Sequence, residues 1–260
     1  MRRIILHAGF HKTGTTSLQQ TLRANRRRLA PEFRLVLRPG MTALCEAARG
    51  YSERRDDLNL GLVKYEAALL AERLQRDPAD TILISSEDLS GHMPGRRGLR
   101  DYSAAPKLMQ ALALAFDTAL PEDELVFFFT TREAESWLRS CYTQHLKASR
   151  LPLDADDYMK RFAGSASLES IVAQVAKALP RHAVLQAALE DHKARPLGPA
   201  EALLDVAGVP DARRGRLKYL PPANTAPPAE IQARLLELNR SALSQSALQE
   251  AKRALFRSLR

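Results

Sequence analysis

The chain has 260 residues, of which 45% are hydrophobic and 27% are charged. This composition excludes wholesale disorder and a collagen-like or coiled-coil chain, and no stretch approaches the ~18 uninterrupted apolar residues of a membrane helix. Lysine and arginine number 39 against 30 acidic residues, which gives a net charge of +9. This charge should attract a polyanion, which could be nucleic acid, an acidic membrane surface or a multiply phosphorylated small molecule, but an arginine-rich composition also raises the net charge without any ligand.

Two features of the chain bear on its compartment. The two cysteines, Cys45 and Cys141, are too few for a disulfide framework or a zinc site of their own, which fits a reducing environment. The apolar run after Arg2 and Arg3 is too short for a secretory signal. We expect a cytoplasmic protein that is not integral to a membrane, and its oligomeric state stays open.

Hydrophobic periodicity and turn residues predict strands that alternate with helices. In chain order, we expect a strand at 3–8, a glycine loop at 9–14, helices at 15–28 and 58–76, a strand at 81–85, a loop at 91–100, a helix at 104–120, a strand at 125–130, helices at 133–148, 155–162 and 168–179, a strand at 182–186, and helices at 199–207 and 229–259. On the helix at 58–76, the spacing predicts a core-facing stripe of Leu62, Tyr65, Leu69 and Leu70. This alternation indicates an α/β fold with a doubly wound parallel sheet flanked by helices, in one domain over residues 1–260.

Residues 7–18 read HAGFHKTGTTSL and combine a glycine loop with the start of a helix. Such a loop directs backbone N–H groups at one point, and the helix dipole adds partial positive charge there. Gly9 and Gly14 let the backbone approach a ligand, and Lys12 adds a full charge. Three hydroxyl side chains follow the second glycine: Thr15, Thr16 and Ser17. The segment predicts an anion site.

The position of the lysine distinguishes this loop from the nucleotide P-loop, in which lysine directly follows the second glycine. Here Lys12 stands two positions before Gly14. The order Lys-Thr-Gly-Thr-Thr resembles the 5′-phosphosulfate loop of sulfotransferases that use 3′-phosphoadenosine 5′-phosphosulfate (PAPS). The resemblance implies a P-loop NTPase-like sulfotransferase fold and PAPS as co-substrate. It assigns six residues to the 5′-phosphosulfate: Lys12, Thr13, Gly14, Thr15, Thr16 and Ser17.

A second element matches the same family. Its members hold the 3′-phosphate of PAPS with an arginine at the end of a central strand and a serine farther along the chain. Arg132 follows the strand predicted at 125–130, and Ser140 stands eight positions later. The resemblance therefore implies that Arg132 and Ser140 bind the 3′-phosphate.

Three positions depart from the pattern of many cytosolic members. Ser17 stands where they carry a tryptophan against adenine, and Ala134 stands where they carry a proline. The heparan and glycolipid types also lack that tryptophan, and this loop is closer to theirs. The late Arg-Lys-Gly element of the family has only a weak counterpart in residues 213–215. The residues that contact adenine are therefore unassigned.

Sulfuryl transfer, like phosphoryl transfer, depends mainly on positioning and on neutralising charge on the leaving oxygen. The resemblance gives the second task to Lys12 and requires no metal ion. The acceptor, a hydroxyl or less readily an amine, also needs a general base. Glu87 is the first candidate, because it follows the strand at 81–85 and sites of open α/β sheets form at the carboxyl ends of strands. His11, beside Lys12, is the second.

Each candidate also has a structural interpretation. Glu87 or Asp88 could instead cap the following segment or pair with an arginine. His92, in a glycine-rich loop, is expected to be exposed to solvent, and Trp137 is expected to pack in the core.

Three functions remain open at this point. The first is a PAPS-dependent sulfotransferase acting on a small-molecule, carbohydrate or lipid acceptor that the sequence does not identify. The second is a P-loop nucleotide kinase, which the displaced lysine disfavours. The third is a non-catalytic protein that binds a nucleotide or another polyanion. Aromatic residues make up 6% and do not interleave with the basic run at 26–28, so we expect no nucleic-acid partner.

Overall fold

The structure is a computed structural model, and it describes residues 2–221 and 226–257. Five parallel strands form its central sheet in the order β2-β3-β1-β4-β5. The strands are β1 (Arg3–His7), β2 (Phe33–Leu37), β3 (Thr81–Ser85), β4 (Glu124–Thr131) and β5 (Ala183–Ala188). In the centre, Ile5 of β1 is in register with Leu83 of β3 and Val126 of β4. The side chains of these central strands are apolar on both faces of the sheet, because helices cover both faces.

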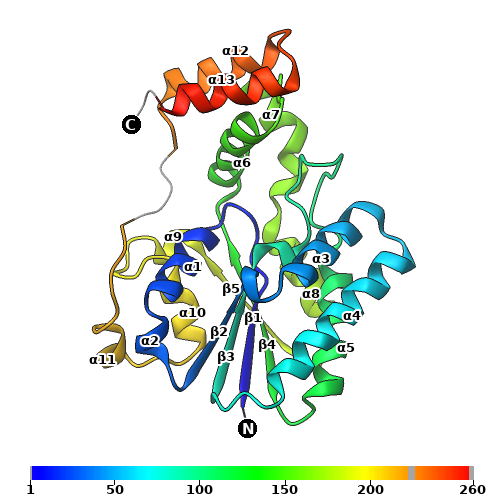
Figure 1. The fold of residues 1–260 in the computed structure, drawn as a ribbon, viewed down its shortest axis with the longest axis vertical. Coiled ribbons are helices and arrows are strands. Elements are labelled where there is room, and N and C mark those ends of the chain that lie inside the picture. Colours follow the sequence, from blue (N-terminus) through cyan, green and yellow to red (C-terminus); the bar gives the residue numbers. More distant parts are fainter. Residues whose placement is uncertain (1, 222–225, 258–260) are drawn as a thin grey trace.

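Helices pack on both faces of the sheet, which confirms the predicted doubly wound α/β arrangement (Figure 1). One face, with Ile5 and Phe128, is covered by α1 (Thr15–Ala24), α2 (Arg26–Leu29) and α10 (Ala200–Val206). The other face, with Leu6 and Phe127, is covered by α3 (Thr42–Arg54), α4 (Asp57–Leu74), α5 (Ala105–Ala119) and α8 (Leu168–Ala178). The core therefore consists of two apolar layers separated by the sheet.

A second group of helices lies beyond the carboxyl ends of the strands, far from the N-terminus (Figure 1). It comprises α6 (Ala134–Ala148), α7 (Ala155–Phe162), α12 (Ala229–Arg240) and α13 (Gln245–Arg257). Two short helices, α9 (Leu189–His192) and α11 (Asp211–Arg214), and three 3₁₀ segments, Arg38–Gly40, Glu87–Ser90 and Ala163–Ala166, complete the described elements. None of the helices in the described ranges has the length and apolar character needed to cross a membrane.

Two predicted helices are wrong in extent, because contacts distant in sequence break them. The helix expected at 15–28 divides at Asn25, whose amide donates to the carbonyls of Thr21 and Lys218. The helix expected at 229–259 divides between α12 and α13, where Arg150 donates to two carbonyls of the connection. Positions 258–259 of that prediction lie outside the described residues.

The stripe predicted on the helix at 58–76 is also wrong in part. Leu70 is buried, but Leu62, Tyr65 and Leu69 are 47%, 59% and 38% exposed. The buried face of α4 is instead formed by Leu60, Val63, Ala67, Leu70, Ala71 and Leu74. Both sets have helical spacing, so periodicity alone could not select the set that faces the core. Helix α4 therefore carries two apolar faces.

Candidate functional site

The glycine loop predicted at 9–14 connects the end of β1 to the start of α1. Gly14 is the N-terminal cap residue of α1, with φ +89°, and no side chain caps the helix. A Cβ at Gly14 would lie 2.8 Å from Leu189 and 2.9 Å from Pro199, so only glycine fits. Lys12 also has positive φ, +69°, which is uncommon for a residue with a side chain. The loop thus leaves the N–H groups at the start of α1 available to an anion.

A cavity of about 1030 Å³ lies at this helix start. It is lined by nine of the ten residues that the sequence singles out: His11, Lys12, Gly14, Thr15, Thr16, Ser17, Glu87, Arg132 and Ser140. The tenth, Thr13, is fully buried, and its hydroxyl hydrogen-bonds to the Phe10 carbonyl at 2.6 Å and to the Thr130 hydroxyl at 2.7 Å. Thr13 can therefore offer a ligand its backbone N–H but not its side chain.

The charge of the cavity is strongly positive. Seven basic residues line it: Lys12, Arg96, Arg132, Arg139, Lys147, Lys193 and Arg195. Glu87 is the one carboxylate among the described lining residues. Arg139 pairs with Glu135, and Arg195 pairs with Asp205, whereas the other five form no ion pair within the described ranges. Such a surplus of positive charge favours an anion with several charges.

Arg132 connects the two predicted phosphate motifs. It directly follows β4, and its Nη1 donates to the backbone carbonyl of Lys12 at 3.1 Å. Its Nε donates to the Ser136 hydroxyl at 3.0 Å, and Ser140 lies one helical turn farther along α6. Two segments 120 positions apart therefore meet at one wall of the cavity.

The Lys12 ammonium extends toward α6, where its Nζ lies 3.5 Å from Oε1 of Gln144. Burial lowers the pKa of Lys12, and the positive charges of Lys147 and Arg132 lower it further. An anion placed among these three cations would oppose that shift and would itself be stabilised.

Glu87 is the second residue after β3 and opens the 3₁₀ segment that follows. Its Oε2 accepts a hydrogen bond from Nε2 of Gln19, at 2.9 Å, which orients the carboxylate from α1. It forms no ion pair with a described residue, so the cap-or-pair interpretation fits Asp88 and not Glu87. Glu87 is thus the acidic group that can interact with a molecule in the cavity.

Both ring nitrogens of His11 contact other side chains. Nδ1 lies 3.0 Å from the Tyr102 hydroxyl, and Nε2 lies 3.5 Å from the Asp88 carboxylate. Asp88 also accepts from Arg38 at 2.7 Å. Burial alone would raise the pKa of Asp88, but hydrogen bonds from His11 and Arg38 outweigh it and lower the pKa to about 2. Both nitrogens of His11 therefore have partners in the protein.

Two further expectations have clear outcomes. Trp137 is buried as predicted, and its indole donates to the His11 carbonyl at 2.8 Å. The prediction that His92 is exposed is wrong: it is buried and contacts the Glu53 carboxylate at 2.7 Å. Gly91 lies against α3, where a Cβ would be 2.6 Å from Ser52, and the His92 N–H donates to the Ser52 hydroxyl at 3.0 Å, which the sequence pattern does not indicate.

A buried polar network connects the loop to the central strands of the sheet. Nδ1 of His7 lies 2.8 Å from the Ser85 hydroxyl, and Nε2 lies 3.2 Å from the Thr130 hydroxyl, which in turn contacts Thr13. Burial lowers the pKa of His7 to about 3, so the ring is neutral near pH 7. A Cβ at Gly9 would lie 2.6 Å from the ring nitrogen. The network fixes the loop on β1, β3 and β4.

Several contributors to the site were not predicted. Gln19, Arg96, Lys147 and Lys193 lack a motif, although polar residues at the ends of apolar runs could have indicated the network of His7, Ser85 and Thr130. The weak candidate at 213–215 does not line the cavity. Arg213 donates to the carbonyls of Arg28 and Leu29, and Arg214 pairs with Glu201, so both stabilise the fold.

The far wall of the cavity comes from the helices beyond the sheet. Gln232 of α12 lines it and lies 3.4 Å from the Thr143 hydroxyl of α6. Asn239 and Lys252 donate to the Leu146 carbonyl near the end of α6, at 3.1 and 2.7 Å. These bonds attach α12 and α13 to α6.

Comparisons of the chain with protein-family models, with curated proteins and with solved structures find no match. The residues and geometry of the cavity are therefore the basis for assigning a function.

Proposed function

We propose that the protein is a PAPS-dependent sulfotransferase that transfers a sulfuryl group to a hydroxyl of an acceptor molecule. The observation that carries the proposal is the hydrogen bond from Arg132 to the Lys12 carbonyl. It joins the segment that resembles a 3′-phosphate site to the segment that resembles a 5′-phosphosulfate loop. PAPS carries anionic groups at both of these positions.

The cavity offers groups for each end of this donor. Residues 12–17 present the start of α1, the Lys12 ammonium and the hydroxyls of Thr15, Thr16 and Ser17 to the 5′-phosphosulfate. Arg132 and Ser140 are assigned to the 3′-phosphate, and Nη2 of Arg132 makes no hydrogen bond with a described residue. A volume of about 1030 Å³ is at the upper end for ligand sites and leaves room for an acceptor beside the nucleotide.

Transfer forms a bond between the acceptor oxygen and sulfur and breaks the bond between sulfur and the oxygen of the 5′-phosphate. Adenosine 3′,5′-bisphosphate leaves with the electrons of the broken bond. Lys12 stabilises the charge that develops on the leaving oxygen. The acceptor proton passes to Glu87, which Gln19 orients and which forms no ion pair with a described residue. His11 is less suited as base because both of its ring nitrogens have partners.

Calorimetry with adenosine 3′,5′-bisphosphate and, separately, with ATP and magnesium tests this proposal. We expect the bisphosphate to bind in the micromolar range or tighter. At a hundredfold excess over its dissociation constant it should stabilise the fold by about 2.7 kcal/mol. Tighter binding of ATP with magnesium would instead support a nucleotide kinase. Binding of the bisphosphate without any turnover of PAPS across a screen of hydroxyl acceptors would support a non-catalytic nucleotide-binding protein.

A further inference from the structure

Helix α4 exposes a row of large apolar side chains on the outside of the molecule. Leu58, Leu62, Tyr65 and Leu69 are 83%, 47%, 59% and 38% exposed. At 100° per residue, these four fall within a narrow stripe, about 160° around the helix from the buried face. Helix α4 packs against α3 and α5 with its buried face, so the stripe on its opposite face points away from the sheet (Figure 1). Contiguous exposed apolar patches of this kind mark interaction sites.

The spacing of the stripe is 4, 3 and 4 residues, the pattern by which one helix packs along another. It is also self-complementary about a point between Leu62 and Tyr65. A second α4 running antiparallel would place Leu62 against Tyr65 of the other copy, and Leu58 against Leu69. A two-fold axis makes each of these two contacts occur twice in the interface.

Gly61 borders the stripe in the middle of the helix. It has no positive φ, and a Cβ there would meet nothing within 4 Å, so nothing in one copy requires glycine. An exposed glycine in a helix is less favourable than alanine by about 1 kcal/mol. A missing side chain beside the stripe would let a second helix approach closely.

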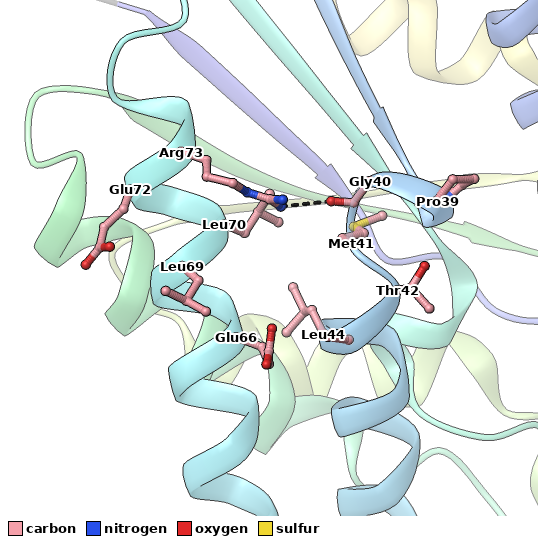
Figure 2. A pocket seen from close by; sticks show the side chains of 11 residues that line it. Pro39, Gly40, Met41, Thr42, Leu44, Glu66, Leu69, Leu70, Glu72 and Arg73 are labelled. Carbon is pink, nitrogen blue, oxygen red and sulfur yellow. Dashed lines mark hydrogen bonds between the residues drawn. The ribbon is translucent and has the colours of Figure 1, made fainter.

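A groove of about 500 Å³ lies at the Leu69 end of the stripe, between α4 and the start of α3. Leu44 and Met41 line its other side, and Arg73 reaches across it to the Gly40 carbonyl at 2.8 Å (Figure 2). In the antiparallel arrangement, Leu58 of the second copy lies at this end. The most exposed large apolar side chain among the described residues would thus meet the leucine and methionine side chains of this groove, whose lining also includes Glu66, Glu72 and Arg73.

We infer that the exposed stripe of α4 binds the same stripe of a second copy, in an antiparallel, two-fold symmetric dimer. Charge supports this occupant, because the first turn carries Asp57 and the last turn carries Arg73. Antiparallel pairing places the acidic turn of one copy beside the basic end of the other and opposes the two helix dipoles.

The area agrees with a weak, concentration-dependent dimer. With roughly 200 Å² for each fully exposed large side chain, the stripe exposes roughly 450 Å² per copy. The stripes of two copies together bury roughly 900 Å², below the roughly 1,200 Å² at the low end of specific interfaces, and the residues that flank the stripe add to it. No residue of α3 or α4 lines the cavity of about 1030 Å³, so the dimer leaves that cavity open.

Sedimentation equilibrium over a concentration series tests the inference without knowledge of the reaction. We expect wild type to shift toward twice its mass of 28.9 kDa as its concentration rises. Leu62→Glu and Leu69→Glu should raise the dimer dissociation constant at least tenfold while the circular dichroism spectrum stays unchanged. Leu243→Glu is the matched control, because Leu243 is 39% exposed on the connection between α12 and α13, and it should dimerise like wild type.

Cysteine pairs test the direction of the helices. An equal mixture of L58C and L69C chains should form a disulfide-linked dimer on oxidation. L58C alone should not, because the two-fold axis separates its two copies by about 16 Å. Wild type that stays monomeric at every concentration, or a dimer that survives Leu62→Glu, would overturn the inference. Efficient cross-linking of L58C with itself would overturn the antiparallel arrangement.

Discussion

The two walls of the cavity are built differently. The inner wall follows the carboxyl ends of β1, β3 and β4, and the buried contacts of His7 with Ser85 and Thr130 hold it in place. The outer wall consists of helices beyond the sheet, tied to α6 by bonds to the Leu146 carbonyl and by apolar side chains such as Leu235 that pack against the core. Residues at the carboxyl ends of paired strands are held more rigidly than residues on helices that pack beyond the sheet. We therefore expect the chemistry to depend on the inner wall and the acceptor preference on the outer wall.

The largest effect should come from Glu87 on the inner wall. Glu87→Gln keeps the shape and the hydrogen bond from Gln19 but removes the basic oxygen, so turnover of PAPS should fall by about 10²–10⁴-fold. Affinity for adenosine 3′,5′-bisphosphate should stay within about twofold, because the proposed mechanism assigns Glu87 to the acceptor and not to the donor. Hydrolysis of PAPS can serve as the assay until an acceptor is known. Full activity of Glu87→Gln together with an inactive His11→Asn would move the base to His11.

Substitution of Lys12 should affect both nucleotide affinity and turnover, in contrast to substitution of Glu87. Its charge acts most strongly on the leaving oxygen as the bond breaks, so Lys12→Ala should lower turnover by about a hundredfold or more. Nucleotide affinity should fall less than turnover does. Stopped-flow measurement of PAPS breakdown alongside calorimetry would show this split. Equal losses in both quantities would mean that Lys12 only binds the donor.

The network below the inner wall predicts acid sensitivity of the fold. Below about pH 6.5 the unfolded chain protonates His7, whereas the folded chain does so only near its lowered pKa of about 3. The free energy of unfolding should therefore fall with decreasing pH across this window, by about 1.4 kcal/mol per pH unit from His7. His145, whose pKa burial lowers to about 4, adds to the fall above that pH.

Urea unfolding at several pH values, in wild type and in His7→Gln, measures this slope. In His7→Gln, the free energy of unfolding should change less with pH than in wild type, because the contribution of His7 is removed. This should hold even if the variant is less stable than wild type at pH 7. A wild-type slope that His7→Gln leaves unchanged would show that the ring takes up its proton in the folded state.

Ser140 should show the smallest effect. Ser140→Ala removes one hydroxyl from the predicted 3′-phosphate site and should weaken adenosine 3′,5′-bisphosphate by about 1 kcal/mol, roughly fivefold. Adenosine 5′-phosphate, which lacks the 3′-phosphate, should bind the variant and wild type alike. If Ser140→Ala lost affinity for both nucleotides, Ser140 would contact a part of the ligand other than the 3′-phosphate.

The central sheet and the loop could be predicted from the sequence because their signals are local. The apolar runs of β1, β3 and β4 end within two residues of their predicted ends, and Gly14 marks the start of α1. Strand β2 was missed because it is a short edge strand interrupted by Arg34, and α3 was missed because much of its buried face consists of small residues and Gly50 stands inside it.

The remaining errors come from contacts between distant segments. Arg150 interrupts the C-terminal helix although no glycine or proline stands at the break. The exposed stripe of α4 matches the pattern of a core face, and only the folded protein shows that another face of the helix is buried. Within the site, the ends of the apolar runs indicate His7, Ser85 and Thr130 separately, but only the sheet shows that the three side chains meet.

The affinity that a 3′-phosphate adds tests the central claim most directly. Calorimetry of adenosine 3′,5′-bisphosphate and adenosine 5′-phosphate should show tighter binding of the bisphosphate to wild type by about 2 kcal/mol, roughly thirtyfold. Arg132→Gln should abolish most of this difference, whereas Arg139→Gln, on the same wall but paired with Glu135, should retain it. Equal affinities of the two nucleotides for wild type, or an equal loss of both in Arg132→Gln, would contradict the account.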